Sequence, residues 1–169
     1  YSPAGKVPIL IDGGEPVWES LAILEHLAER FPQAGLWPAD QRARSHARAV
    51  ATEMHAGFQA LRRDCTMNLW LPPKPRPQND EVMENVRRIE ALWADCRARF
   101  GSGGPFLFGT FGNADAMYAP VVTRFETYGI KVADDTRDYM TSVMSTEAFQ
   151  SWKEAALGEP WVVPSDEVD

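Results

Sequence analysis

A short segment near the start of the chain, KVPILIDGGEPVWES (residues 6–20), carries groups that could hold a small ligand. Pro8 lies in the first half of an apolar run, and the Val7–Pro8 bond is a candidate for the cis form, which proline makes accessible. A cis bond there would turn the backbone N–H and C=O of Val7 outward instead of into a sheet ladder. The alternative is an ordinary proline on an edge strand.

Glu19 and Ser20 follow at the point where the second strand of this segment should meet a helix. Unpaired N–H groups and the positive end of a helix dipole make such a position receptive to a carboxylate. Ser20 can offer its hydroxyl and its backbone N–H to such a group. The plainer interpretation is that Ser20 is a helix N-cap with an acid beside it.

The elements that must position these residues are a β-hairpin and one helix. Residues 7–11 and 16–18 predict two short antiparallel strands joined by a glycine-containing turn. From Ser20 onward apolar residues recur at spacings of three and four, which predicts an amphipathic helix that ends before Pro32. Two strands and one helix do not make an independently stable layer. Because the chain also begins without Met and in loop-like composition, we expect further N-terminal sequence to complete the sheet.

The remainder of the chain predicts helices, after a link at about residues 32–40. Apolar residues keep helical spacing from Gln41 to about Trp70, which predicts one long helix, and the proline-rich run over 72–77 must break it. Further helices are expected over 80–100, with Asn79 or Asp80 as the cap, and over 113–128, 134–144 and 145–157, the last capped by Ser145. The fold class predicted is α+β, with a small β-β-α unit followed by an all-helical domain.

Composition excludes several classes of function. Seventeen Lys and Arg against 24 Asp and Glu leave a net charge of −7, and no long basic run offers a nucleic-acid surface. The longest apolar runs span a few residues, so we expect no membrane-spanning helix, and the start of the chain does not read as a signal peptide. Two cysteines in helical patterns favour a reducing, cytoplasmic location over a disulfide framework. Three histidines without metal-ligand spacing predict no metal site.

Four motifs, in this order and at these separations, resemble those of one family. They are Lys6-Val7-Pro8, Glu19-Ser20, Leu36-Trp37-Pro38 and Gly112-Asn113-Ala114-Asp115. The chain resembles a cytosolic-type, bacterial-like glutathione S-transferase that lacks its first strand, first helix and second strand. The resemblance covers essentially the whole chain. It implies a partial thioredoxin-like, glutathione-binding domain over residues 1–35 and an all-helical domain over residues 36–169.

The same resemblance implies glutathione as the co-substrate. In the family, the backbone N–H and C=O that correspond to Val7, beside Pro8, pair with the cysteinyl part of glutathione like an added strand. Ser20 would hold the carboxylate of the γ-glutamyl group, and Glu19 would hold its ammonium group. Lys6 could meet the glycyl carboxylate, although most lysines are simply solvated.

The chain departs from the family's pattern at two points. The family carries a Ser or Thr helix cap with an Asp three residues later, whereas here Asp115 is present but the cap position holds Gly112. We interpret this pair as a folding element. Family enzymes also stabilise the glutathione thiolate with a Tyr, Ser or Cys near the first helix. That helix has no counterpart in this sequence, so the catalytic residue is unknown.

A second substrate should lie between the domains, against the long predicted helix. The candidate lining residues are Phe58, Arg62, Met67 and Asn68. Met67 and Asn68 interrupt the apolar stripe and are the better candidates, because Met and Phe at helical spacing are usually core. Cys65 lies in the apolar stripe without a visible activating base, which favours packing over nucleophilic chemistry.

The predicted function is therefore that of a glutathione S-transferase, an enzyme that adds the glutathione thiolate to an electrophilic small molecule. The family implies a homodimer. One alternative is a glutathione-dependent cis–trans isomerase resembling maleylacetoacetate isomerases, and another is a non-catalytic binding or scaffold module. A disulfide reductase would require a cysteine in the expected N-terminal sequence. Retention of both Val7-Pro8 and Glu19-Ser20 argues against a scaffold, and the sequence does not identify the electrophile.

Overall fold

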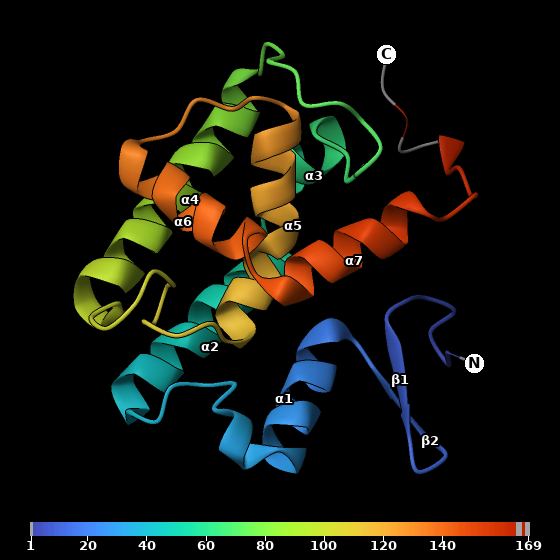
Figure 1. The fold of residues 1–169 in the computed structure, drawn as a ribbon, viewed down its shortest axis with the longest axis vertical. Coiled ribbons are helices and arrows are strands. Elements are labelled where there is room, and N and C mark those ends of the chain that lie inside the picture. Colours follow the sequence, from blue (N-terminus) through green and yellow to red (C-terminus); the bar gives the residue numbers. More distant parts are fainter. Residues whose placement is uncertain (1, 165–166, 168–169) are drawn as a thin grey trace.

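A computed structural model describes residues 2–164 and 167 of the chain. Within these residues the elements are a two-stranded sheet, seven α-helices and one short 3-10 helix. Figure 1 shows the hairpin and α1 at one end of the molecule, with the other helices gathered into a bundle beside them. The predicted α+β class, a thioredoxin-like remnant followed by helices, is confirmed.

The N-terminal part is a hairpin followed by one helix. β1 (Ile9–Asp12) pairs antiparallel with β2 (Glu15–Trp18), with Ile9 opposite Trp18. Gly13 and Gly14 form the turn with φ angles of 59° and 92°, which a residue without Cβ adopts at little cost. α1 (Ser20–Arg30) leads into the 3-10 helix η1 (Pro32–Ala34). α1 thus ends before Pro32, as predicted.

The helical part contains six helices among the described residues. They are α2 (Gln41–Ala56), α3 (Gln59–Asp64), α4 (Asp80–Phe100), α5 (Asn113–Thr127), α6 (Asp134–Met144) and α7 (Glu147–Leu157). Asn79 caps α4, as one of the two predicted caps, by accepting the Val82 N–H at 2.9 Å. The expected cap of the last helix was wrong by one residue, because the Thr146 hydroxyl accepts the Phe149 N–H at 3.2 Å.

The single long helix expected from Gln41 to about Trp70 is wrong. α2 ends at Ala56, and Gly57 adopts an extended backbone with Phe58 at φ 59° before α3 begins. Glycine is a weak helix former, so a break there costs little. The apolar spacing continues across the break because Phe58 and the residues of α3 that follow it still face the same core. Periodicity therefore detected the buried face and missed the break in the helix at Gly57 and Phe58.

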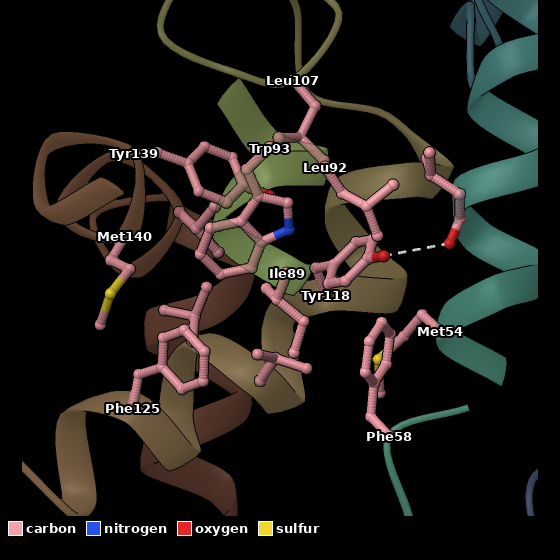
Figure 2. Packing of buried hydrophobic residues seen from close by; sticks show 14 of the residues in the cluster. Met54, Phe58, Ile89, Leu92, Trp93, Leu107, Tyr118, Phe125, Tyr139 and Met140 are labelled. Carbon is pink, nitrogen blue, oxygen red and sulfur yellow. Dashed lines mark hydrogen bonds between the residues drawn. The ribbon is translucent and has the colours of Figure 1, made fainter. Parts of the chain in front are cut away.

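An aromatic cluster fills the middle of the helical part (Figure 2). The Trp93 ring lies 5.4 Å from that of Tyr118, 5.7 Å from that of Phe125 and 4.7 Å from that of Tyr139, measured between centroids. The Tyr118 hydroxyl donates to the Val50 carbonyl at 3.2 Å, and this bond joins α5 to α2. Edge-to-face packing of this kind adds to the stability that burial alone provides.

A buried carboxylate fixes the start of α5. Asp115 accepts hydrogen bonds from the Gly112 N–H at 2.9 Å, the Leu107 N–H at 3.1 Å and the Tyr139 hydroxyl at 3.1 Å. Burial nevertheless raises the pKa of Asp115 to about 6, since desolvation outweighs the three bonds. These contacts are what the interpretation of Asp115 as a folding element requires.

The N-cap position of α5, Gly112, is sterically crowded. A Cβ at Gly112 would lie 2.9 Å from the Leu36 carbonyl oxygen, which also accepts the Asn113 N–H at 2.9 Å. The link between the two parts of the molecule therefore passes too close to the start of α5 for a Ser or Thr. A side chain at position 112 would therefore require this link to shift.

Polar contacts join the N-terminal part to the helical part. Arg48 on α2 makes a two-bond ion pair with Glu25 on α1, with both bonds at 2.8 Å. The Asn113 side chain donates to the Leu24 carbonyl at 3.2 Å. Leu21 and Ala28 of α1 pack partly buried against the helical core. No described helix has the length and apolar character needed to cross a membrane.

Candidate functional site

The predicted cis bond is confirmed, since the Val7–Pro8 peptide is cis. Val7 is 87% exposed, and the ladder between β1 and β2 begins two residues later at Ile9. The peptide groups of Val7 therefore lie outside that ladder. Lys6 and Pro8 are exposed as well, so this end of the hairpin presents its backbone to solvent.

Glu19 and Ser20 form the turn into α1. Glu19 occupies the N-cap position with φ 67° and ψ 135°, and its side chain makes no capping hydrogen bond. Ser20 is the first helical residue, so the interpretation of Ser20 as the N-cap is not what the structure has. A positive φ is costly for a residue that carries a Cβ and persists where surrounding structure holds it.

The hairpin brings the two motifs together. Ile9, which follows Pro8, pairs with Trp18, which precedes Glu19, so the two motifs flank the last pair of the ladder. The exposed backbone of Val7 and the start of α1 thus lie at the same end of the hairpin. This end combines free peptide groups, a helix N-terminus and an exposed carboxylate.

A residue that the sequence did not mark lies against this turn. His55, near the end of α2, places Nδ1 3.5 Å from Ser20 Oγ and Nε2 3.8 Å from a carboxylate oxygen of Glu19. No spacing rule could have found these contacts, because they join positions 35 residues apart in different parts of the fold.

The four residues predicted to line a pocket for the second substrate lie in two different places, as two pairs. Met67 and Asn68 line a hollow of about 280 Å³ together with Trp70, Trp152 and Trp161. We call it the tryptophan-lined hollow. Asn68 there donates to the Glu167 carboxylate at 3.3 Å. Aromatic walls with a few polar groups are typical of small-molecule sites.

Phe58 and Arg62 lie elsewhere. Phe58 is buried in the core near Met54 (Figure 2). Arg62 donates to the carbonyls of Met54 at 2.6 Å, Gly57 at 3.1 Å and His55 at 3.3 Å, and so closes the C-terminal end of α2. Neither residue lines the tryptophan-lined hollow, and the assignment of all four to a substrate pocket stays a prediction.

A second hollow was not anticipated from the sequence. It has a volume of about 340 Å³ and is lined largely by apolar side chains of α5, α6 and α7, among them Ala119, Val143 and Phe149. Trp152 lines this hollow as well as the tryptophan-lined one. α7 therefore separates two recesses of different polarity.

Both cysteines are free and buried in the core. Burial raises the pKa of the Cys65 thiol to about 11 and that of Cys96 to about 12. Cys65 Sγ donates to Gln78 Oε1 at 3.1 Å. A raised pKa leaves less thiolate near neutral pH, so burial argues against a nucleophilic role for either cysteine. Among the residues that the structure describes, no group of three or more His, Cys, Asp or Glu side chains could hold a metal ion.

Comparison with known proteins finds similarity to glutathione S-transferases. The family model described as "Glutathione S-transferase, N-terminal domain" matches residues 1–29, which contain both motifs of the hairpin end. The chain is 35% identical over 129 residues to a probable glutathione S-transferase of Oryza sativa subsp. indica, covering 73% of this chain and 54% of that protein. It is 38% identical over 138 residues to the maleylacetoacetate isomerase of Pseudomonas aeruginosa, covering 76% of this chain and 61% of that protein.

Solved structures share the fold. A glutathione transferase homolog from Burkholderia with bound glutathione superposes with a TM-score of 0.72 at 20% identity, covering 94% of this chain and 76% of that one. The holo structure of a zeta-class maleyl pyruvate isomerase gives a TM-score of 0.61 at 21% identity, with 94% and 76% covered. These two structures share with this chain a fold of two parts, a thioredoxin-like unit and a helical unit. Together these comparisons support a member of the glutathione S-transferase family, and the chain spans 54% and 61% of the two curated relatives described above.

Proposed function

We propose that this chain contributes the glutathione-binding site of a glutathione S-transferase, an enzyme that adds the glutathione thiolate to an electrophilic small molecule. The observation that carries the proposal is the meeting of the cis Val7–Pro8 bond with Glu19 and Ser20 at one end of the hairpin. The Val7 peptide groups would bind the cysteinyl backbone, as an added strand would. Ser20, at the start of α1, would bind the γ-glutamyl carboxylate, which a helix N-terminus favours.

The remaining charged ends of glutathione would meet exposed side chains. The Glu19 carboxylate would pair with the γ-glutamyl ammonium group, and Lys6 with the glycyl carboxylate. Both side chains are exposed, so each pair would contribute modestly to affinity and more to orientation. The tryptophan-lined hollow would hold the electrophile, and its tryptophan rings together with Asn68 suit a flat molecule that also carries polar groups.

The glutathione thiol is mostly protonated at neutral pH and needs a group that stabilises its thiolate. Cys65 and Cys96 are buried with raised pKa values and do not fit that role. The activating group is proposed to lie in sequence outside this chain. Catalysis is thereby assigned to the whole protein and glutathione recognition to this chain.

Calorimetric titration of glutathione into the protein expressed from its complete reading frame tests the proposal. We expect binding that weakens about tenfold in Ser20→Ala, because a hydrogen bond to a charged group is lost. Glu15→Gln is the matched control, since Glu15 is an exposed acid of the same hairpin at its far end. Equal affinity of the wild type and the Ser20 variant would contradict the assignment, and so would an absence of wild-type binding.

A second candidate is the isomerase, favoured by the similarity to maleylacetoacetate isomerases. In that chemistry the thiolate adds to a carbon–carbon double bond, the resulting single bond rotates, and the thiolate leaves, so glutathione is regenerated. Assaying the protein with maleylacetoacetate and with a chloronitrobenzene separates the two. Isomerisation without net consumption of glutathione would favour the isomerase, conjugation would favour the transferase, and binding without either would favour the scaffold.

The proposal also covers the domain boundaries, the oligomeric state and the cellular location. Residues 1–35 would belong to the glutathione-binding domain and residues 36–169 to the helical domain, of which 165–166 and 168–169 lie outside the described residues. The protein would act as a cytoplasmic homodimer. The two free, buried cysteines support the reducing location. Light scattering after size-exclusion chromatography would test the dimer, and a monomeric mass at micromolar concentration would contradict it.

A further inference from the structure

One histidine bridges the two parts of the molecule at the hairpin end. The His55 ring reaches Ser20 with Nδ1 at 3.5 Å and Glu19 with Nε2 at 3.8 Å. Both ring nitrogens thus face the two side chains proposed to hold the γ-glutamyl group. The ring is about one-third exposed, so it lies at the edge of the site and is open to a ligand.

The position of this ring is fixed from the helical side. His55 lies in the last turn of α2, which ends at Ala56, and the Arg62 guanidinium donates to the carbonyls of Met54, His55 and Gly57. These bonds satisfy carbonyls that a helix end would otherwise leave open. The end of α2 is therefore held at a defined place, and His55 is held with it.

The turn on the other side needs such support. Glu19 has a positive φ, and its side chain makes no capping bond to α1. Such a conformation is retained when neighbouring groups fix it. The His55 ring is a neighbour of the Glu19 carboxylate that comes from outside the hairpin and α1.

We propose that His55 is a positioning residue for the γ-glutamyl group of glutathione, a role that rests on the proposed function. With its hydrogen on Nδ1, the ring donates to Ser20 Oγ, and the Ser20 hydroxyl hydrogen is then free to donate to the ligand carboxylate. The helical part thereby determines the hydrogen-bonding state of the glutathione site.

Two substitutions of His55 distinguish the effect of its hydrogen bond to Ser20 from the effect of its packing. His55→Leu keeps much of the side-chain volume but has no polar atom, whereas His55→Gln restores an N–H donor for Ser20 Oγ. Calorimetry with glutathione should give a dissociation constant about tenfold higher for His55→Leu and within about threefold of wild type for His55→Gln. The unfolding temperature without glutathione should stay within about 2 °C of wild type in both.

His26→Leu is the matched control. His26 Nε2 also contacts a carboxylate across two elements, that of Asp12 at 2.8 Å, but this pair lies at the turn end of the hairpin. The His26→Leu substitution should leave the affinity for glutathione within about twofold of that of the wild type. An equal loss in His26→Leu and His55→Leu would overturn the positioning role, because any weakening of the hairpin would then suffice.

The outcomes also separate this inference from the proposed function. Wild-type binding with unchanged affinity in His55→Leu overturns the role of His55 and leaves the proposed function standing. Weak binding in both His55 variants together with lowered unfolding temperatures shows a structural role and overturns the inference. No glutathione binding by the wild type overturns the proposed function and this inference with it.

Discussion

The two parts of the molecule differ in where their side chains lie. No described residue before Trp37 is buried, and the β-hairpin exposes Val7, Ile11 and Trp18. The helical part contains the whole cluster of buried hydrophobic side chains, with Trp93, Tyr118 and Tyr139 among the most enclosed. Since apolar burial is the main source of folding free energy, the helical part supplies most of the stability of this chain.

The residues that stabilise the fold and the residues proposed to bind the ligand therefore lie in different parts of the molecule. The groups proposed to bind glutathione are the backbone of the exposed Val7, the exposed Glu19 and the half-buried Ser20. They are tied to the stable part by Arg48, Asn113 and His55, all through polar contacts. Substitutions in the helical core should therefore change the free energy of unfolding, and substitutions at the hairpin end should change binding.

The largest effect is expected from Trp93→Ala. Trp93 is 1% exposed and contacts three aromatic rings, so its removal should lower the free energy of unfolding by about 3–5 kcal/mol. Urea denaturation followed by circular dichroism measures it. Trp70→Ala is the control, because Trp70 is 60% exposed and should cost less than about 1 kcal/mol. Similar losses in both variants would contradict the conclusion that the buried cluster is what stabilises the helical part.

Asp115→Asn should have the next largest effect, and one that depends on pH. Asparagine cannot accept from all three donors of Asp115, so we expect a loss of about 2 kcal/mol below pH 3.8. The folded pKa of Asp115, about 6, lies above its ordinary value of 3.8. The contribution of Asp115 is therefore fully present below pH 3.8 and is lost as pH rises through 6.

Relative to Asp115→Asn, the wild type should thus lose its stability advantage between those pH values. Measuring the free energy of unfolding of both proteins at a series of pH values tests this. The other acidic residues contribute equally to the pH dependence of both proteins, so the difference reports on Asp115 alone. An advantage that instead grows with pH would mean that the hydrogen bonds outweigh desolvation at this carboxylate.

Gly112→Ser should destabilise by about 1–2 kcal/mol, although serine is the better N-cap in isolation. The new Cβ would lie 2.9 Å from the Leu36 carbonyl oxygen, at the link between the two parts. Thermal unfolding of Gly112→Ser and Gly112→Ala measures the balance. A more stable serine variant would show that this link moves easily and that the cap gains more than the crowding costs.

Glu19→Gly should change stability least and binding most clearly. Glycine adopts the positive φ of position 19 readily, which offsets its loss of backbone freedom, so the free energy of unfolding should stay within about 1 kcal/mol. Glutathione affinity should fall about tenfold because the carboxylate is lost. Parallel calorimetry and denaturation test this, and a large loss of stability with intact binding would reverse the assignment of the two parts.

Local chemistry made several features predictable. Pro8, the two glycines of the hairpin turn, Asn79 and Pro32 each act through backbone geometry or hydrogen bonds with near neighbours, and each structural expectation placed on them is met. The resemblance to the family likewise rested on short motifs, and comparison supports it. Such features depend on residues a few positions apart, so a sequence contains the information needed to infer them.

By itself, then, the sequence determined the α+β order of elements and the resemblance to the glutathione S-transferase family, and it predicted the hairpin end as the place of a ligand site. Only the tertiary structure decided three other matters: the break at Gly57 and Phe58, the close approach that requires Gly112, and the contact of His55 with Ser20. The physical reason is common to all three. Apolar spacing records that a side chain is buried but not which segment buries it, and contacts between distant segments are set by how the helices pack.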